Sequence, residues 1–435
     1  MKLLHTKYAA VLIITIAGFS IQAQNTLIAD DAVAIALKNN FGILVARNSA
    51  EIAKINNAAG SAGMLPTLSI AGSGNYSLNT IDQRPSTGGE THAKGVGSST
   101  VNAALQLNWT LFDGGKMFVT KNKLREIESL SRVQYKDKVQ KSVFAVIAAY
   151  YDIVRQKQEL VLLNEVIAYN ADRVTVLQTS FNAGLSPKTN FLQAQIDLNV
   201  IRENAINQKT VIGAAKRTLN QLLGRDAAID FDVQDSIPLG NAPDTSQLHE
   251  KLYANNTDVL SLQKQIEVAD LTLSEYRTLR YPKINLNAGY DFLRMSASAG
   301  SILHSREHGP FVGAQVSMPL YQAGGVSRQI ATARLALESA QFDLEEAQKQ
   351  VSIQARNALD DFNNQRQLLL IEKENTALAK ENLDISMQRL RLGQSTSLEL
   401  RQAQESYEQA RTRHINIQYN LKIAETRLKQ LLAEL

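Results

Sequence analysis

The chain has 435 residues, with 46 Lys and Arg against 42 Asp and Glu, and no Cys. Without cysteine it can form no disulfide, no thiolate metal site and no cysteine nucleophile. The near balance of charge gives no reason to expect nucleic acid as a partner. Aromatic residues make up only 6% and prolines number eight, and long stretches are rich in Ala, Leu, Gln, Glu, Lys and Arg, which is typical of extended helices.

Residues 1–23 are predicted to form a secretory signal peptide. Lys2 and Lys7 precede an uncharged, mostly apolar run from Ala9 to Ile21, and Ala23 is a small residue suited to cleavage. This run is too short to cross a bilayer as a helix, which needs about 20 residues. A buried helix is the alternative interpretation. Removal of the segment would leave 44 basic and 42 acidic residues, a net charge of +2.

The rest of the chain is predicted to be an internal duplication. The segment Leu111–Gly115 matches Leu320–Gly325, 209 positions later, with Ala323 interpreted as one extra residue in the second copy. The same offset of 209 relates Gly184 to Gly393 and Ser186 to Ser395. Upstream, Asn40 and Asn256, and Pro66 and Pro282, are 216 positions apart, so a slip of seven residues falls between Pro66 and Phe112. We predict a first repeat over residues 24–223, a linker over 224–243 and a second repeat over 244–435.

Each repeat is predicted to contain one long helix beside shorter ones. The stretch from Val326 to about Arg391 has no proline or glycine, and its apolar positions alternate in steps of three and four, which indicates a coiled-coil seam. The corresponding helix of the first repeat runs from about Lys116 to Ser180. Such a helix is about 100 Å long. The segments Asp30–Gly63 and Pro187–Leu223 together have a similar length, so we expect them to stack end to end beside the long helix.

Each long helix is predicted to end in a tight turn and return as a helical hairpin. The tips lie near Gly184 and Gly393, because glycine suits the left-handed position after a helix. In the first repeat we expect Ser186 to cap a helix that begins at Pro187. In the second repeat the segment Thr396–Glu399 fits a capping box.

Strict alternation of apolar and polar residues predicts two β-hairpins, over residues of about 67–112 and about 283–321. Each strand is expected to have about 10 residues, which suits a tilted transmembrane strand. The polar, glycine-rich segments Asn79–Ser99 and Arg294–Gly309 are expected to be external loops. A soluble sandwich would show the same alternation, so the strands alone leave that alternative open. The apolar positions of the second strand are Val101, Ala103, Leu105, Leu107, Trp109 and Leu111.

The pattern at the ends of the strands predicts a membrane interface. Trp109, Phe112 and Tyr321 fall where the strands meet the helices, as an aromatic girdle would. Four strands cannot close a barrel in lipid, because open edges leave unpaired backbone groups. Three copies would form a trimeric 12-stranded transmembrane β-barrel, continuous with a long coiled-coil α-helical barrel. The expected fold class is therefore an α+β membrane protein with an internal duplication.

At these residues the chain resembles the TolC family of outer-membrane efflux proteins, also called outer membrane factors. The most specific segments are Val316–Gly325 and Leu111–Gly115, followed by the two tips. The resemblance implies a homotrimer in the outer membrane of a Gram-negative bacterium, with a long periplasmic extension. It also implies passive conduction of substrate in a tripartite efflux or type I secretion system. The implied partners are outer-membrane lipid, a periplasmic adaptor protein and an inner-membrane pump of RND, ABC or MFS type.

The resemblance also implies site residues. Adaptors grip the hairpin tips in this family, which maps onto Gly184, Leu185, Ser186, Gly393, Gln394 and Ser395. The pore of the family narrows at the tips and is often lined there by acidic residues. Glu399 is the matching candidate, and Asn190 holds the corresponding place in the first repeat. Glu399 could instead serve only as a helix cap, or do both.

No chemistry of an enzyme stands out in the sequence. His304–His308 matches the H-x-x-E-H pattern of zinc proteases, but that pattern needs a helix and is expected here in a loop. The segment Gly114–Lys116 lacks the other residues of a phosphate-binding loop. We therefore predict no catalytic residues, no metal and no cofactor. The alternative function is a periplasmic coiled-coil adaptor or scaffold without a pore, which would have one helical hairpin and a compact β-domain.

Overall fold

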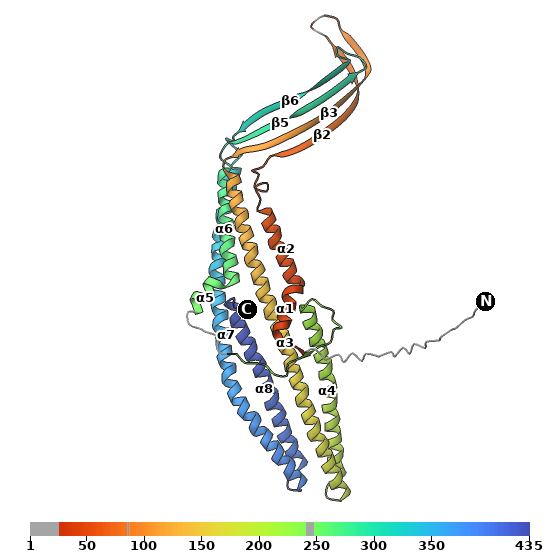
Figure 1. The fold of residues 1–435 in the computed structure, drawn as a ribbon, viewed down its shortest axis with the longest axis vertical. Helices are drawn as coiled ribbons and strands as arrows, with labels where there is room; N and C mark the ends of the chain where they lie inside the picture. The colour runs from red at the N-terminus through yellow and green to blue at the C-terminus, as the bar shows by residue number, and fades with distance from the viewer. Residues whose placement is uncertain (1–25, 85, 87, 241–247) are drawn as a thin grey trace, which may run out of the picture.

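The computed structural model describes residues 26–84, 86, 88–240 and 248–435. A long helical body carries a four-stranded sheet that extends from one of its ends, and two helical hairpins close the other end (Figure 1). The predicted signal peptide at 1–23 lies outside the described residues, as do positions 241–243 of the predicted linker. Among the helices in the described ranges, none is long and apolar enough to cross a bilayer.

The same order of elements occurs twice along the chain. The first half contains β1 (Thr26–Leu27), α1 (Ala29–Asn39), α2 (Phe41–Asn56), β2 (Thr67–Gln83), β3 (Thr91–Asp113), α3 (Lys116–Asn182) and α4 (Lys188–Leu222). The second half contains β4 (Asp232–Val233), α5 (Leu248–Asn255), α6 (Thr257–Thr278), β5 (Lys283–Ala297), β6 (His304–Ser317), α7 (Gly325–Arg391) and α8 (Ser397–Leu431). Helices α3 and α7 both have 67 residues, and α4 and α8 both have 35. The predicted long helices and helical hairpins are therefore confirmed.

The turn from sheet to long helix corrects the alignment of the two copies. Gly114 and Gly115 have φ angles of 78° and 88° before α3, while Ala323 and Gly324 have φ angles of 46° and 72° before α7. Ala323 therefore stands in the place of Gly114 and is not an extra residue, so the offset of 209 runs unbroken through the junction. The prediction of an extra residue was wrong because it aligned identical residues, Gly114–Gly115 with Gly324–Gly325. The equivalent positions are instead the two consecutive residues in the left-handed conformation, one of which is an alanine in the second repeat.

The helical segment that precedes β2 is divided into α1 and α2, which the sequence did not predict. Asn40 separates α1 from α2 with extended backbone angles, and its side-chain oxygen accepts a hydrogen bond from the Ile43 N–H at 3.1 Å. The Asn40 Nδ2 donates to the Leu222 carbonyl, the last residue of α4, at 2.7 Å. One side chain thus caps α2 and closes the end of α4.

The second copy contains the same joint. Asn256 caps α6 by accepting from the backbone N–H groups of Asp258 and Val259, and its Nδ2 donates to the Leu431 carbonyl at the end of α8, at 3.0 Å. Helices α2 and α6, which lie nearer the sheet, therefore continue along the body from the ends of α4 and α8, respectively (Figure 1). This arrangement confirms the predicted end-to-end stacking.

The apolar core runs along the helix contacts instead of forming one centre. In the middle of the body, Tyr150 of α3 is fully buried against Leu219 of α4 and Phe231. Its hydroxyl donates to the Leu27 carbonyl at 2.8 Å. This bond ties α3 to the small parallel pair of β1 and β4 that crosses the body at this level.

The sheet has the order β2-β3-β5-β6 and is antiparallel throughout. Its register places Leu105 between Ile70 and Tyr290, and the other apolar positions follow on the same face. This face is exposed, since Ile70 keeps 82% and Val312 keeps 76% of its accessible surface. The predicted hairpins with one apolar and one polar face are therefore confirmed.

The strands are longer than the predicted ten residues. They have 17, 23, 15 and 14 residues in chain order. The expected external loops are shorter than predicted, because backbone pairing continues beyond the apolar band: β2 reaches Gln83 and β3 begins at Thr91, and in the second hairpin only residues 298–303 lie between the strands. The segment His304–His308 therefore lies in β6 and not in a loop. Alternation along the strand places Glu307 on the face opposite to both histidines.

The inner ends of the hairpins also differ from the prediction. A bulge at Leu111 shifts the register, so Phe112 pairs with Ile284 and takes the apolar position expected for Leu111. The second hairpin was expected to reach about residue 321, but β6 ends at Ser317. Tyr321 therefore lies in the connection to α7.

We expect Asn40→Ala and Asn256→Ala each to lower the free energy of unfolding by about 2 kcal/mol, because each removes a helix cap and a hydrogen bond between two helices. Chemical denaturation of the detergent-solubilised protein measures the change. Asn48→Ala is the matched control, since Asn48 is an exposed residue in the interior of α2. Equal stability of the control and the two joint variants would contradict the role of the joints.

Candidate functional site

The two helical tips have the same backbone geometry. At the first tip, the Leu185 N–H donates to the Ser180 carbonyl at 2.8 Å and the Gly184 N–H donates to the Phe181 carbonyl at 2.9 Å. Gly184 has a φ of 73°. This is a Schellman turn, and the second tip repeats both bonds around Gly393, whose φ is 70°.

Both tips present apolar side chains to solvent. Leu185, Leu392 and Leu398 are 83%, 70% and 58% exposed. Apart from each glycine's own chain neighbours, no described atom lies within 4 Å of the place where a Cβ would stand on Gly184 or Gly393, so no other described residue covers either turn. The six residues predicted to contact an adaptor therefore gather as two exposed turns at the end of the body that is farthest from the sheet (Figure 1). Their role in docking stays a prediction.

The cap of the first return helix differs from the prediction. Pro187 occupies the capping position and α4 begins at Lys188, so Ser186 is not the cap. The Ser186 Oγ instead accepts from Asn190 Nδ2 at 3.2 Å. The cause is that proline, with its φ fixed near −65°, also suits the extended conformation just before a helix.

At the second tip the predicted cap forms. Thr396 Oγ1 accepts from the Glu399 N–H at 3.2 Å. The Ser395 hydroxyl donates to Glu399 Oε2 at 2.6 Å. This hydroxyl, followed by the Thr396 N–H, holds the pKa of Glu399 below its ordinary value, so the exposed carboxylate is charged in neutral solution. Glu399 is therefore confirmed as part of a helix cap, and its place at a pore constriction stays a prediction.

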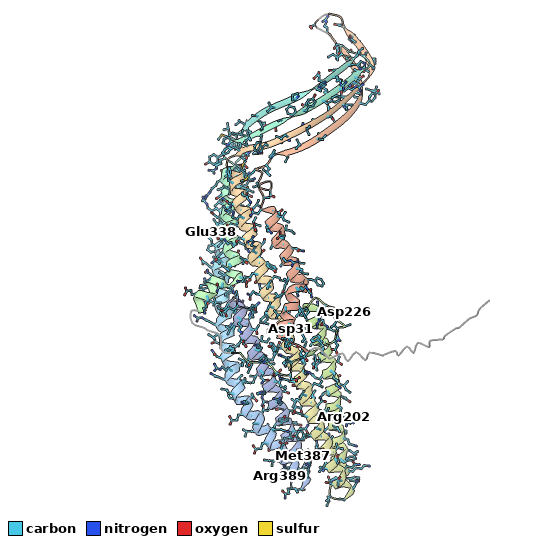
Figure 2. All side chains as sticks on the ribbon, in the orientation of Figure 1. Asp31, Arg202, Asp226, Glu338, Met387 and Arg389 are labelled. Carbon is cyan, nitrogen blue, oxygen red and sulfur yellow. The ribbon has the colours of Figure 1, made fainter. Side chains whose placement is uncertain are left out.

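Arg389 stabilises the second tip from inside the turn. It lies near the tip of the body (Figure 2), where its Nη2 donates to the Gln394 carbonyl at 3.1 Å. Cations near the end of a helix also interact favourably with its last carbonyl groups. The tip of the second hairpin is thus closed by side-chain and backbone contacts together.

The two hairpins are tied to each other just above the tips, which the sequence analysis missed. Arg173 of α3 is almost fully buried, and its Nη1 contacts Asp197 Oδ2 of α4 at 3.0 Å. Its Nε and Nη2 donate to Ser397 Oγ of α8 at 3.2 and 2.9 Å. A second, exposed ion pair joins Arg391 to Asp172 at 3.0 Å. The contact with Asp197 lies within the first hairpin, whereas Ser397 lies 224 positions from Arg173 and Arg391 lies 219 positions from Asp172. No local sequence pattern could indicate these two contacts between the hairpins.

The predicted interface aromatics lie at the junction of sheet and body. Trp109 and Phe112 are near the end of β3 with 37% and 38% of their surface exposed, and Tyr321 is 87% exposed. The Trp109 Nε1 donates to the Met64 carbonyl at 3.0 Å, which fixes the indole against the segment that enters β2. Their contact with a membrane stays a prediction. Within the described residues no cluster of three or more His, Asp or Glu side chains is suited to hold a metal ion.

The fold and the tips define a class of protein: a duplicated chain in which a sheet with an exposed apolar face continues into long helical hairpins. Residues 32–225 and 248–434 match the family of outer membrane efflux proteins. The chain belongs to this family.

Individual relatives cover most of the chain. The proteases secretion protein PrtF of Dickeya chrysanthemi is 21% identical over 94% of this chain and 87% of its own length. The outer membrane protein TolC of Escherichia coli is 22% identical over 90% of this chain and 78% of its own length. The crystal structure of the outer membrane protein VceC from Vibrio cholerae has a TM-score of 0.76 at 15% identity, and covers 93% of this chain and 96% of that one.

Membership of the family makes the chain an outer-membrane channel for efflux or secretion. The family is one of transport channels and not of enzymes. The alternative of a periplasmic scaffold without a pore receives no support from these similarities.

Proposed function

We propose that the chain works as a homotrimer, in which three sheets close a 12-stranded transmembrane β-barrel and the helical bodies continue it as a periplasmic α-helical barrel. The observation that carries this proposal is the sheet itself. Its apolar face is exposed, and β2 and β6 each have a partner strand on one side only. Unpaired backbone groups cost several kcal/mol each in lipid, so these edges require other copies.

The number of copies follows from the need for a channel. Two copies would give a barrel of about eight strands, whose interior is just wide enough to be filled by side chains. A wider barrel is needed for an aqueous path, and three copies are the smallest closed set that provides it. The trimer implied by the family resemblance supports the same number.

Engineered cysteines test the closure, since the chain has no cysteine of its own. Ser69, Ala71 and Ser73 on the polar face of β2 are each changed to Cys together with Gln315→Cys on the polar face of β6. At least one pair should give covalent trimers under oxidation, because the edges meet between copies. Ser69→Cys with Asn287→Cys is the control, since Asn287 lies on the inner strand β5. A monomeric mass in detergent, with no cross-linked product from any edge pair, would contradict the trimer.

The helical tips are proposed to dock onto a periplasmic adaptor, and through it onto an inner-membrane pump of RND, ABC or MFS type. The supporting observation is the pair of exposed turns at Gly184 and Gly393, each with an uncovered leucine beside it. Helices of 67 residues reach about 100 Å from the sheet, which carries the tips deep into the periplasm. The channel itself would be passive, and the pump would supply the energy that moves the substrate.

Leu185→Glu should raise the Kd for the cognate adaptor by about thirtyfold, because a charge at the centre of an apolar contact costs about 2 kcal/mol. Biolayer interferometry with the immobilised trimer measures the change. Ile302→Glu is the matched control: Ile302 is 58% exposed in the loop at the opposite end of the molecule. Unimpaired docking of the Leu185 variant would refute the assignment of the tips.

Glu399 is proposed to line the pore constriction, with Asn190 in the corresponding place of the first repeat. The supporting observation is that each side chain is hydrogen-bonded to the serine four residues earlier: Asn190 donates to Ser186, and Glu399 accepts from Ser395. The two residues therefore hold equivalent positions at the two tips. Only Glu399 carries a charge. It would attract divalent cations into the narrow mouth.

We expect Glu399→Gln to weaken the block of conductance by Mg²⁺ in planar bilayers at neutral pH. Because the pKa of Glu399 is depressed, the wild-type block should persist down to the ordinary value of 4.5 and disappear only as the pH falls further. Ser395→Ala should move this transition to higher pH, since it removes the main hydrogen bond to the carboxylate. Asn190→Ala is the control and should not change the titration. An unaltered block in Glu399→Gln would leave this residue as a helix cap only.

A further inference from the structure

A pair of arginines interrupts the apolar face of the sheet at a defined level. Arg294 of β5 and Arg306 of β6 are direct cross-strand partners. The pairs on the same face nearer the helices are Phe292 with His308 and Tyr290 with Pro310. Both arginines are exposed. The cationic pair therefore comes directly after the last aromatic residues of the apolar band.

No carboxylate lies on this face beside the two arginines. Asp291 and Glu307 are the nearest acidic residues along β5 and β6. Each is an odd number of positions from the arginine on its own strand, so alternation of side chains places it on the opposite face of the sheet. On the neighbouring strand β3, the partner of Arg294 is Val101. Within the described parts of the chain, neither guanidinium has an ion pair or a hydrogen bond. Like charges directly opposite each other destabilise a sheet, so an anion from outside the chain would stabilise this pair.

The level of the pair matches a membrane surface. Ile284 begins the apolar band on β5, and Arg294 follows ten positions later. That is about 34 Å along the strand at about 3.4 Å per residue. With a strand tilt of about 40°, the height is about 26 Å, close to the apolar band of about 25 Å in outer-membrane barrels. The arginines therefore stand where lipid tails end and headgroups begin, on the side away from the helices.

The surroundings hold one of the two guanidiniums in place. The Arg306 guanidinium carbon lies 5.4 Å from the centre of the Phe292 ring, a cation–π contact. On the same face, His308 stacks on Tyr290 and its Nδ1 lies 2.9 Å from the Tyr290 hydroxyl. An arginine fixed by an aromatic face keeps its planar fork free for bidentate hydrogen bonds to a phosphate.

We propose that Arg294 and Arg306 bind the phosphate groups of a phosphorylated lipid in the outer leaflet of the membrane. The phosphate lies between the two guanidiniums and removes their repulsion, while the acyl chains cover the aromatic and aliphatic side chains below. This binding site rests on the proposed placement of the sheet across the membrane. It fixes the depth of the barrel in the bilayer through a charge-assisted contact in addition to the aromatic girdle at the other end.

The experiment uses the full-length protein in detergent, with bisphosphorylated lipid A as the probe and dephosphorylated lipid A as the reference. The variant Arg294→Gln/Arg306→Gln should bind the bisphosphorylated probe at least about tenfold more weakly than the wild type, as expected for a loss of 1.4 kcal/mol. Native mass spectrometry with increasing probe measures the affinity. Arg280→Gln/Lys283→Gln is the matched control, because it removes two exposed charges at the helix end of the sheet and should bind as the wild type does.

Equal affinity of the two double variants would overturn the proposal, and so would equal binding of phosphorylated and dephosphorylated lipid A by the wild type. Displacement of the lipid by inorganic phosphate at equal concentration would assign the site to a soluble anion and would also overturn it. The trimer mass and conductance of the same preparations test the membrane placement separately. A variant that conducts as the wild type does, but has lost the lipid, supports the arginine site on an intact channel.

Discussion

The unpaired edges of the sheet are the constraint on which the rest of the structure depends. Strands β2 and β6 each leave one row of backbone groups without a partner, beside a face of exposed apolar side chains. Water could satisfy those groups, but lipid cannot. In the proposed assembly the edges meet between copies, and the helical bodies must then stand side by side. The exposed apolar residues along the helices are consistent with such packing, because the core of a single chain is spread thinly along its helix contacts.

Two kinds of junction transmit the geometry of the sheet to the tips. The left-handed pairs at Gly114–Gly115 and Ala323–Gly324 turn a strand into a long helix. The asparagine joints at Asn40 and Asn256 set a short helix on the end of a return helix. Because both junctions recur, the hairpins have equal lengths in the two repeats. Equal lengths bring both tips to one level, which a common docking surface requires.

The sequence predicts features that depend on neighbours in the chain. The alternation in β3 and β5 fixes the apolar face, and the seam from Val326 locates α7 to within one residue of its start. Contacts between distant segments escape such patterns. Arg173 meets Ser397 across two hairpins, and the break at Asn40 depends on the carbonyl that Leu222 presents to it. The strands exceed their expected length because register is carried by backbone pairing, which continues past the last apolar side chain.

The two repeats have the same geometry at their helical tips but differ in charge there. Asn190 and Glu399 stand at equivalent positions, each hydrogen-bonded to a serine one turn earlier, yet only one is ionised. In a trimer of two-hairpin chains, six hairpins would surround the axis and every second one would carry a carboxylate. Wider spacing weakens the repulsion between these carboxylates, because Coulomb energy falls with distance. In the proposed trimer the amide of Asn190 would therefore let the helical tips approach one another more closely than six charged side chains would, while the proposed constriction would still present three carboxylates to a passing cation.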